Sequence, residues 1–282
     1  MLRIAIPNKG SLAGPAAAML SEAGYQQRGH AKELVFVDPV NEVEFFYLRP
    51  RDIALYVSAG RLDIGITGRD LLVDSGASAQ EILQLGFAHS TYRYAAKPGT
   101  VGDVADLAGR TIATSYEGIV TRHLAEAGVE ARVIHLDGAV ETAVELGVAD
   151  AIADAVETGS SLRDAGLVAI GEPILESEAV IITRGGGAEI APEANRFLRR
   201  LQGVLVARTY VMMDYDCRAE HLDRAIRLTP GLESPTVSPL HNEGWVAVRA
   251  MVPTARAQQI MDDLYELGPR AVLTTSIHAC RL

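Results

Sequence analysis

The stretch Gly147-Val-Ala-Asp150-Ala-Ile-Ala-Asp154 repeats the pattern of an earlier stretch, Gly60-Arg-Leu-Asp63-Ile-Gly-Ile-Thr67. In each, Gly-x-x-Asp is followed by a short strand of small apolar residues that ends in a polar group. We interpret the two as equivalent strands of two similar α/β lobes, although a resemblance over eight positions is also compatible with coincidence. Around them, short apolar runs alternate with helix-period segments over the first two thirds of the chain. This alternation is typical of βα units that cover a largely parallel sheet.

The apolar and helical patterns predict the elements of both lobes. Strands are predicted over residues 3–6, 43–48, 63–66, 111–114, 133–136, 149–154 and 167–170, and helices over 11–23, 51–59, 69–74, 118–127 and 139–146. The strand-like stretches 91–96 and 179–183 would be the two crossings between the lobes. Lobe I then comprises residues 1–92 and 180–208, and lobe II, residues 93–179, is an insertion within it. The cleft between the lobes is the default ligand site.

From Val211 onwards the pattern changes. Strands are predicted over residues 211–214, 235–239, 245–252 and 270–277, with helices over 219–228 and 255–267. The order βαββαβ is that of a ferredoxin-like module, here residues 209–282. Cys217 and Cys280 follow the C-terminal ends of the first and last strands, which are antiparallel neighbours in that topology, so we expect no disulfide between them.

Composition excludes several classes of partner. The chain has 282 residues, and 26 Lys+Arg against 36 Asp+Glu give a net charge of −10, so no nucleic acid or anionic membrane surface is expected as principal partner. We find no run of 18 apolar residues that would span a membrane. Pro7, Asn8 and Lys9 stand where a signal peptide would carry its apolar stretch, and two cysteines are too few for a disulfide scaffold. We therefore expect a cytoplasmic protein.

The segment Asp154-Ala-Val-Glu-Thr158-Gly-Ser-Ser-Leu162 follows a predicted strand and opens a helix. Gly159 permits a tight turn, and backbone N–H groups and hydroxyls at a helix N-terminus can surround a phosphate. An acid shortly before such a loop can accept hydrogen bonds from a sugar diol. For Thr-Gly-Ser-Ser alone, a polar strand-to-helix loop with an N-cap is the better interpretation. Asp154 and the preceding strand favour a sugar phosphate instead.

The run from Glu141 to Leu162 resembles the signature of ATP phosphoribosyltransferase, the first enzyme of histidine biosynthesis. Segments along the whole chain look like that family's long form: Pro7-Asn-Lys-Gly10-Ser-Leu, Asp38-Pro-Val-Asn41, Leu48-Arg-Pro50, Gly65-Ile-Thr-Gly68-Arg-Asp70-Leu and Gly231-Leu-Glu-Ser-Pro-Thr236. Two positions depart mildly, since Ala155 replaces a larger aliphatic residue and Ser161 replaces a threonine but keeps its hydroxyl.

The resemblance implies two lobes like those of type II periplasmic binding proteins, followed by a ferredoxin-like (ACT-like) domain. It also implies transfer of phosphoribosyl from phosphoribosyl pyrophosphate (PRPP) to N1 of ATP, with release of pyrophosphate. Magnesium would accompany the pyrophosphate, as it usually binds substrate phosphates, water and one or two carboxylates. No catalytic residue and no metal ligand are assigned. The resemblance further implies a homo-oligomer, a hexamer built from dimers.

Three sets of site residues follow from the resemblance. PRPP would contact Asp154, Ala155, Val156, Glu157, Thr158, Gly159, Ser160 and Ser161. ATP would contact Lys9, Gly10, Arg49, Asp70, Leu71, Tyr116 and Glu141. L-Histidine, as a feedback inhibitor, would contact Asp216, Leu232, Ser234, Thr236 and Ala271.

Each of these assignments has a plainer alternative. Lys9 is by itself a surface lysine beside a helix start, and Asp70 and Glu141 complement helix dipoles. Tyr116 at a strand end is more often a packing residue. The C-terminal module is by itself an oligomerisation domain, in which Asp216 merely ends a strand. The seven histidines share no ligand spacing, so we assign no metal to them.

Two other functions fit parts of the pattern. Solute-binding proteins also have two α/β lobes joined by two crossings, but the expected lack of an export signal and the third module count against them. Phosphoribosyltransferases of nucleotide salvage also carry an acid before Thr-Gly-x-Ser. The Gly-Ile-Thr-Gly segment and the C-terminal module have no place in that class.

Overall fold

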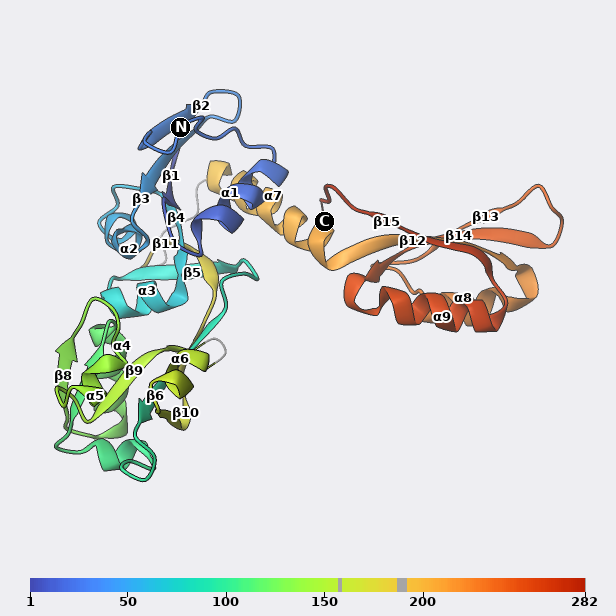
Figure 1. Cartoon of the computed structure of the whole chain (residues 1–282). Coiled ribbons are helices and arrows are strands. Elements are labelled where there is room, and N and C mark those ends of the chain that lie inside the picture. Colours follow the sequence, from blue (N-terminus) through green and yellow to red (C-terminus); the bar gives the residue numbers. More distant parts are fainter. Residues whose placement is uncertain (157–158, 187–191, 282) are drawn as a thin grey trace. The chain divides into compact units, whose positions relative to one another are not determined.

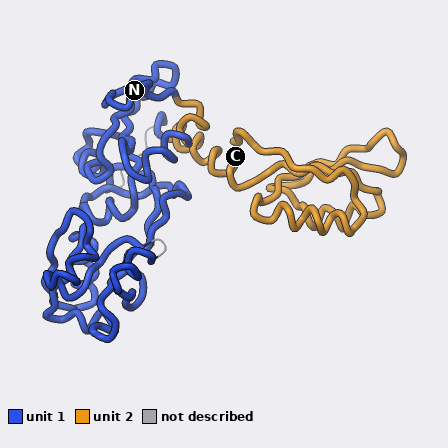
Figure 2. The backbone as a smooth tube through the Cα atoms, in the orientation of Figure 1, with its two compact units in different colours: residues 1–18, 26–194 blue, residues 19–25, 195–282 orange. Residues whose placement is uncertain are grey.

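The computed structural model describes residues 1–156, 159–186 and 192–281. The chain divides into two compact units, which are described separately. Unit 1 comprises Met1–Ala18 and Gln26–Ala194, and unit 2 comprises Met19–Tyr25 and the chain from Asn195 onwards (Figure 2). Unit 1 contains two sheets and unit 2 contains one.

The first sheet of unit 1 has the order β2-β3-β1-β4-β11-β5. Its strands are β1 (Leu2–Pro7), β2 (Val35–Asp38), β3 (Val43–Leu48), β4 (Ile64–Gly68), β5 (Ala79–Gln84) and β11 (Ala179–Arg184). The central strand β1 is parallel to both β3 and β4, and β11 is antiparallel to β4 and β5. The helices of this lobe are α1 (Ala13–Glu22), α2 (Pro50–Ser58) and α3 (Arg69–Ser75) (Figure 1). Helix α1 ends in unit 2.

The second sheet has the order β10-β6-β9-β7-β8. Its strands are β6 (Ser90–Ala96), β7 (Thr111–Thr114), β8 (Arg132–His135), β9 (Ala151–Val156) and β10 (Val168–Ser177). Helices η1 (Val104–Leu107) and α4 (Glu117–Ala127) cover one face, where Tyr94 and Ile112 lie in the core. Helices α5 (Thr142–Glu145) and α6 (Ser160–Asp164) cover the other, where Ile152 is buried.

The two sheets repeat one arrangement. Apart from the additional β2, the order β3-β1-β4-β11-β5 corresponds to β8-β7-β9-β6-β10. The matching stretches form β4 and β9, and each of these strands has a parallel neighbour on one side and an antiparallel strand, β11 or β6, on the other. These antiparallel strands follow the two crossings between the sheets. The interpretation of the two stretches as equivalent strands is therefore confirmed.

Unit 2 carries the βαββαβ module expected from the sequence. Its main elements are β12 (Tyr210–Arg218), α8 (Leu222–Leu228), β13 (Thr236–Pro239), β14 (Trp245–Pro253), α9 (Ala257–Leu267) and β15 (Arg270–Ser276), with short 3₁₀ turns η2 (Ala219–His221) and η3 (Thr254–Arg256). The sheet order is β13-β14-β12-β15, with all neighbours antiparallel, and α8 and α9 share one face. Both cysteines are free, as expected. The α/β fold with a ferredoxin-like module is confirmed.

One helix that we did not predict from the sequence precedes this module. Helix α7 (Pro192–Thr209) packs on residues 19–25, where the rings of Phe197 and Tyr25 lie 5.3 Å apart. Arg208 donates two hydrogen bonds of 2.9 Å to the carboxylate of Glu22. Among the described residues, no helix is long and apolar enough to cross a membrane.

Gly65, within the quoted stretch, has a packing role. A Cβ at this position of β4 would lie 2.5 Å from Cγ2 of Ile53 and 3.0 Å from Cγ2 of Val57, both on α2. Ile53 and Val57 are fully buried. The close contact of α2 with the sheet therefore requires a residue without a side chain at Gly65.

We expect Gly65→Ala to lower the free energy of unfolding by about 1–3 kcal/mol, because the added methyl group overpacks this contact. Gly14→Ala is the matched control. Gly14 is exposed on α1, and a Cβ there would have no atom within 4 Å, so the same change costs nothing and favours the helix by up to about 1 kcal/mol. Urea denaturation followed by circular dichroism measures both variants. Equal midpoints for the two would contradict the packing role of Gly65.

Candidate active site

Unit 1 contains a cavity of about 470 Å³. Residues from both of its lobes, each built on one of the two sheets, line this cavity. The first lobe contributes the loop after β1 and the starts of α2 and α3, and the second contributes β6, the start of α4 and the end of β9. The lining residues are Lys9, Gly10, Ser11, Leu12, Arg49, Pro50, Arg51, Asp52, Gly68, Asp70, Leu71, Ala88, Ser90, Tyr92, Tyr116 and Ala155. The cavity thus lies at the carboxyl ends of β1, β3, β4 and β9, the usual position of a ligand in such sheets.

Two cations in this cavity have no side-chain partner among the described residues. Within the described part of the chain, Lys9 and Arg49 form neither a side-chain hydrogen bond nor an ion pair, and both are exposed. Arg49 follows β3 and is the N-cap residue of α2, in the extended conformation that suits a residue before proline. Gly10 has a φ of 77° in the loop that presents Lys9. Uncommitted positive charges in a cavity are suited to an anionic ligand.

Asp70 lies in the first turn of α3 and forms hydrogen bonds with residues of the second sheet. Its carboxylate accepts hydrogen bonds from the Tyr92 hydroxyl at 2.7 Å and from Ser177 Oγ at 2.8 Å. Ser177 Oγ in turn accepts the backbone N–H of Asp70 at 2.9 Å. Burial and the charge of Asp70 raise the pKa of Tyr92, so its hydroxyl stays protonated and donates. The predicted ligand contact of Asp70 therefore comes from a carboxylate that already accepts hydrogen bonds from two strands of the second sheet.

Tyr116 lies at the start of α4 on the cavity wall. Its ring packs edge-on against Tyr92, with centroids 4.7 Å apart and planes at 75°. The guanidinium carbon of Arg51 lies 4.7 Å from the centre of the same ring. Burial raises the pKa of Tyr116. An aromatic ring fixed between a cation and a second aromatic ring provides a rigid surface for a flat ligand.

The predicted PRPP loop begins at the end of β9. Ala155 lines the cavity, and Val156 lines an adjoining hollow of about 300 Å³ with His89, Thr91 and Glu176 among its neighbours. Glu157 and Thr158 lie outside the described residues. Gly159 has a φ of 69°, and Ser160 and Ser161 form the first turn of α6.

Asp154 and Glu141 interact electrostatically. Burial raises the pKa of Asp154, and the nearby charge of Glu141 raises it further. The backbone N–H of Ala155, 2.8 Å from Asp154 Oδ1, acts in the opposite direction. Glu141 does not line the cavity, unlike the other residues predicted to contact ATP. In this structure the clearest effect of Glu141 is to raise the pKa of Asp154.

The residues predicted to bind histidine do not converge within one chain. Asp216 lies on β12, Leu232 and Ser234 lie between α8 and β13, Thr236 lies on β13, and Ala271 lies on β15. Strands β13 and β15 are the two edges of the sheet. Thr236 and Ala271 are therefore separated by two intervening strands, roughly 14 Å at the usual strand spacing.

Sequence reasoning missed four residues that shape the cavity: Arg51, Tyr92, Ser177 and Asp74. Their partners lie 22 to 107 positions away in the chain, so no local pattern reports the contacts. Among the described residues, no group of three or more His, Cys, Asp or Glu side chains could hold a metal ion. A resident metal centre formed by these side chains alone is not present there.

Comparisons with known proteins agree with the sequence resemblance. The family model HisG, ATP phosphoribosyltransferase, matches residues 49–203, and that of the HisG C-terminal domain matches residues 207–279. The ATP phosphoribosyltransferases of Streptomyces avermitilis and Salinispora tropica are 74% and 60% identical to this chain, each over 100% of both chains. The ATP phosphoribosyl transferase (HisG:HisZ) complex from Thermotoga maritima is 25% identical, with a TM-score of 0.62 over 72% of this chain and 97% of that chain. The chain belongs to the ATP phosphoribosyltransferase family, and its C-terminal domain is the one expected of the long form.

Proposed function

We propose that the cavity of unit 1 transfers phosphoribosyl from PRPP to N1 of the adenine of ATP and releases pyrophosphate, the first reaction of histidine biosynthesis. The observation that carries this proposal is one cavity in which two uncommitted cations, a fixed aromatic ring and the start of the PRPP loop come together. Both substrates are polyanions. The lining offers cations for phosphate groups and an aromatic ring for adenine, and Asp154 directly precedes Ala155 of the lining.

Positioning is the main task of these residues. Lys9 and Arg49 bind the triphosphate of ATP, Tyr116 orients adenine, Asp154 accepts hydrogen bonds from the ribose hydroxyls of PRPP, and the loop to Ser161 holds its 5′-phosphate. Adenine N1 has its own lone pair and attacks the anomeric carbon as the bond to pyrophosphate breaks. The transition state resembles an oxocarbenium ion, so orientation and charge neutralisation replace a protein nucleophile.

Magnesium is proposed as the cofactor. Since the described side chains form no three-residue metal cluster, the donor set fits an ion held mainly by phosphate oxygens and water, with one or two carboxylates at most. The ion would neutralise the leaving pyrophosphate. We assign no protein ligand to it.

The remaining proposals concern the organisation and location of the chain. We propose lobe I as residues 1–92 and 180–208, lobe II as 93–179 and a regulatory domain from 209. The two repeated sheets and the antiparallel module support a division into three parts. The bounds differ in detail, since β6 of the second sheet begins at Ser90 and the chain from Asn195 onwards belongs to unit 2. Free cysteines and a biosynthetic role with ATP support a cytoplasmic location.

The direct test mixes the full-length protein with ATP, PRPP and magnesium and measures pyrophosphate release together with the ultraviolet change of N1-substituted adenine. We expect both signals to require both substrates. Arg49→Ala and Lys9→Ala should each raise the KM for ATP about tenfold or more, because each removes a charge-assisted contact. Lys97→Ala is the control, since Lys97 is exposed and does not line the cavity. No ATP-dependent consumption of PRPP would overturn the proposal.

The raised pKa of Asp154 predicts how activity depends on pH. Protonation removes the acceptor that the ribose hydroxyls need, so kcat/KM for PRPP should fall as pH decreases through this raised pKa. Glu141→Gln removes the neighbouring charge, lowers the pKa of Asp154 and should move this acid limb to lower pH. Glu145→Gln, on the same short helix, should leave the limb in place. An unchanged limb in Glu141→Gln would contradict the coupling.

We propose that the C-terminal module binds L-histidine as a feedback inhibitor and that the protein is a homo-oligomer, a hexamer built from dimers. A ligand that contacts residues on both edges of the sheet requires a second copy beside an edge, and this supports the link between the two proposals.

For regulation, Asp216→Ala should abolish inhibition by histidine and leave the uninhibited rate unchanged, because it removes the carboxylate that pairs with the ligand's cation. Asp223→Ala, an exposed position on α8, is the control. Rates with increasing histidine measure both variants. Point variants are preferable to a chain ending at Arg208, since the carbonyl of Cys280 packs closely against Gly203 of α7. Unaltered inhibition in Asp216→Ala would place the effector elsewhere.

A further inference from the structure

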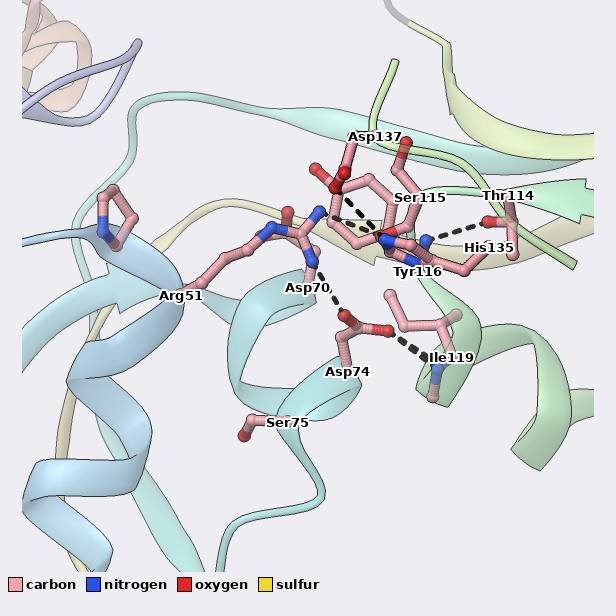
Figure 3. Close-up of polar contacts among 12 residues, drawn as sticks. Arg51, Asp70, Asp74, Ser75, Thr114, Ser115, Tyr116, Ile119, His135 and Asp137 are labelled. Carbon is pink, nitrogen blue, oxygen red and sulfur yellow. Dashed lines mark hydrogen bonds and ion pairs between the residues drawn. The ribbon is translucent and has the colours of Figure 1, made fainter. Parts of the chain in front are cut away.

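The first turn of α4 is capped by a residue from the other lobe. Tyr116, at the N-cap position, makes no side-chain capping hydrogen bond. Instead, Oδ1 of Asp74, near the end of α3, accepts the backbone N–H of Gly118 at 2.8 Å. It also accepts the backbone N–H of Ile119 at 3.3 Å (Figure 3). These are N–H groups that no residue within the helix can satisfy. Asp74 lies 44 positions before Gly118, so this cap is a tertiary contact between α3 and α4.

Gly118 allows the two helices to meet. A Cβ at this position would lie 2.1 Å from the carbonyl oxygen of Asp74 and 2.9 Å from its carbonyl carbon. Both atoms belong to the backbone and have little freedom to move away. The contact is therefore built for glycine and fixes the start of α4 against the end of α3.

The same carboxylate also anchors Arg51. Oδ2 of Asp74 accepts a hydrogen bond from Arg51 Nη1 at 3.1 Å, and only 14% of the Asp74 side chain is exposed. Arg51 Nη2 donates to the carbonyl of Ser115 at 2.9 Å, beside Tyr116, whose ring it covers. Figure 3 shows Arg51 between Asp74 and the Ser115–Tyr116 segment. Asp74 thus controls Tyr116 in two ways, through the helix start and through Arg51.

Helix α3 fixes Tyr116 from a second direction. Asp70, one helical turn before Asp74, accepts the hydroxyl of Tyr92, against which the Tyr116 ring packs. Unlike Asp70, Asp74 does not line the cavity. Its contacts are with groups that hold the aromatic ring rather than with the space that a ligand would occupy.

We propose that Asp74 is a positioning residue for the nucleotide: it holds the Tyr116 ring in place to receive adenine, acting through Arg51 and the first turn of α4. This inference rests on the proposed role of Tyr116 in binding ATP. Its specific consequence is that changes at Asp74 affect the ATP subsite and leave the PRPP subsite largely unaffected.

Two substitutions separate the two functions of the carboxylate. Asp74→Asn keeps an oxygen that can cap Gly118 and Ile119 but presents an amide to Arg51, so it breaks the ion pair and preserves the cap. Asp74→Ala removes both. We expect each to raise the KM for ATP, by roughly tenfold in Asp74→Ala, with the KM for PRPP changed by less than about twofold. Asp103→Ala is the matched control, because Asp103 caps η1 of the second lobe by accepting the Val104 N–H and does not line the cavity.

A double-mutant cycle tests whether Asp74 acts through Tyr116. The affinity for ATP alone is measured by calorimetry on the full-length wild type, Asp74→Asn, Tyr116→Ala and the double variant. If the proposal holds, Asp74→Asn weakens ATP binding in the wild-type background and has little further effect in the Tyr116→Ala background. The same factor in both backgrounds would show that Asp74 acts elsewhere and would overturn the proposal, as would unchanged affinity in Asp74→Asn.

The same measurements distinguish failure of this proposal from failure of the proposed role of Tyr116 in ATP binding. If Tyr116→Ala itself leaves ATP binding unchanged, the role of Tyr116 is wrong and this proposal fails with it. If Tyr116→Ala weakens ATP binding and Asp74→Asn does not, the proposed function stands and only the positioning role is overturned. Since Asp74→Asn retains the cap, its result is decisive even where Asp74→Ala does not fold.

Discussion

The carboxylate of Asp70 accepts hydrogen bonds from Tyr92 and Ser177 of the second sheet, and the shared cavity depends on this contact. The residues around it join the two crossings of the chain. The carbonyl of Glu178, between β10 and β11, accepts the N–H of Arg69 at 3.0 Å, and its carboxylate accepts the N–H of Gly86, between β5 and β6, at 2.9 Å. The start of α3 is therefore bonded to the second lobe and to one crossing, which is itself bonded to the other.

An acidic chain can bind polyanions if some of its cationic side chains are not already paired with acidic groups of the protein. With a net charge of −10, the protein offers no general attraction to them. Arg69 forms a bidentate ion pair with Glu81. Arg51 pairs with Asp74 and donates a hydrogen bond to a backbone carbonyl. Lys9 and Arg49 are exempt from such pairing within the described residues. Lys9 and Arg49 thus remain available to an anion in the cavity, whereas Arg51 and Arg69 are already paired.

The sequence predicted those parts of the structure that have a local pattern. The stretches ending at Thr67 and Asp154 could be recognised as equivalent strands. Short apolar runs that alternate with turns can be read from residues close together in the sequence. Helix α7 had a comparable signal, since Phe197, Leu201 and Val204 recur at helical spacing and are buried, but it was not recognised. The hydrogen bonds that Ser177 donates to Asp70 and that the Gly118 N–H donates to Asp74 had no local signal. They depend on how two lobes meet, which is a property of the tertiary structure alone.

The same reasoning explains why binding and lobe arrangement cannot be independent in this fold. Tyr116 belongs to the second lobe, yet Arg51 and Asp74 of the first lobe hold its ring and its helix. A ligand that binds better when these contacts are formed must also stabilise the contacts, by the same free energy. Since α3 carries both Asp70 and Asp74, one seven-residue helix connects the lobes and supports the aromatic wall of the cavity.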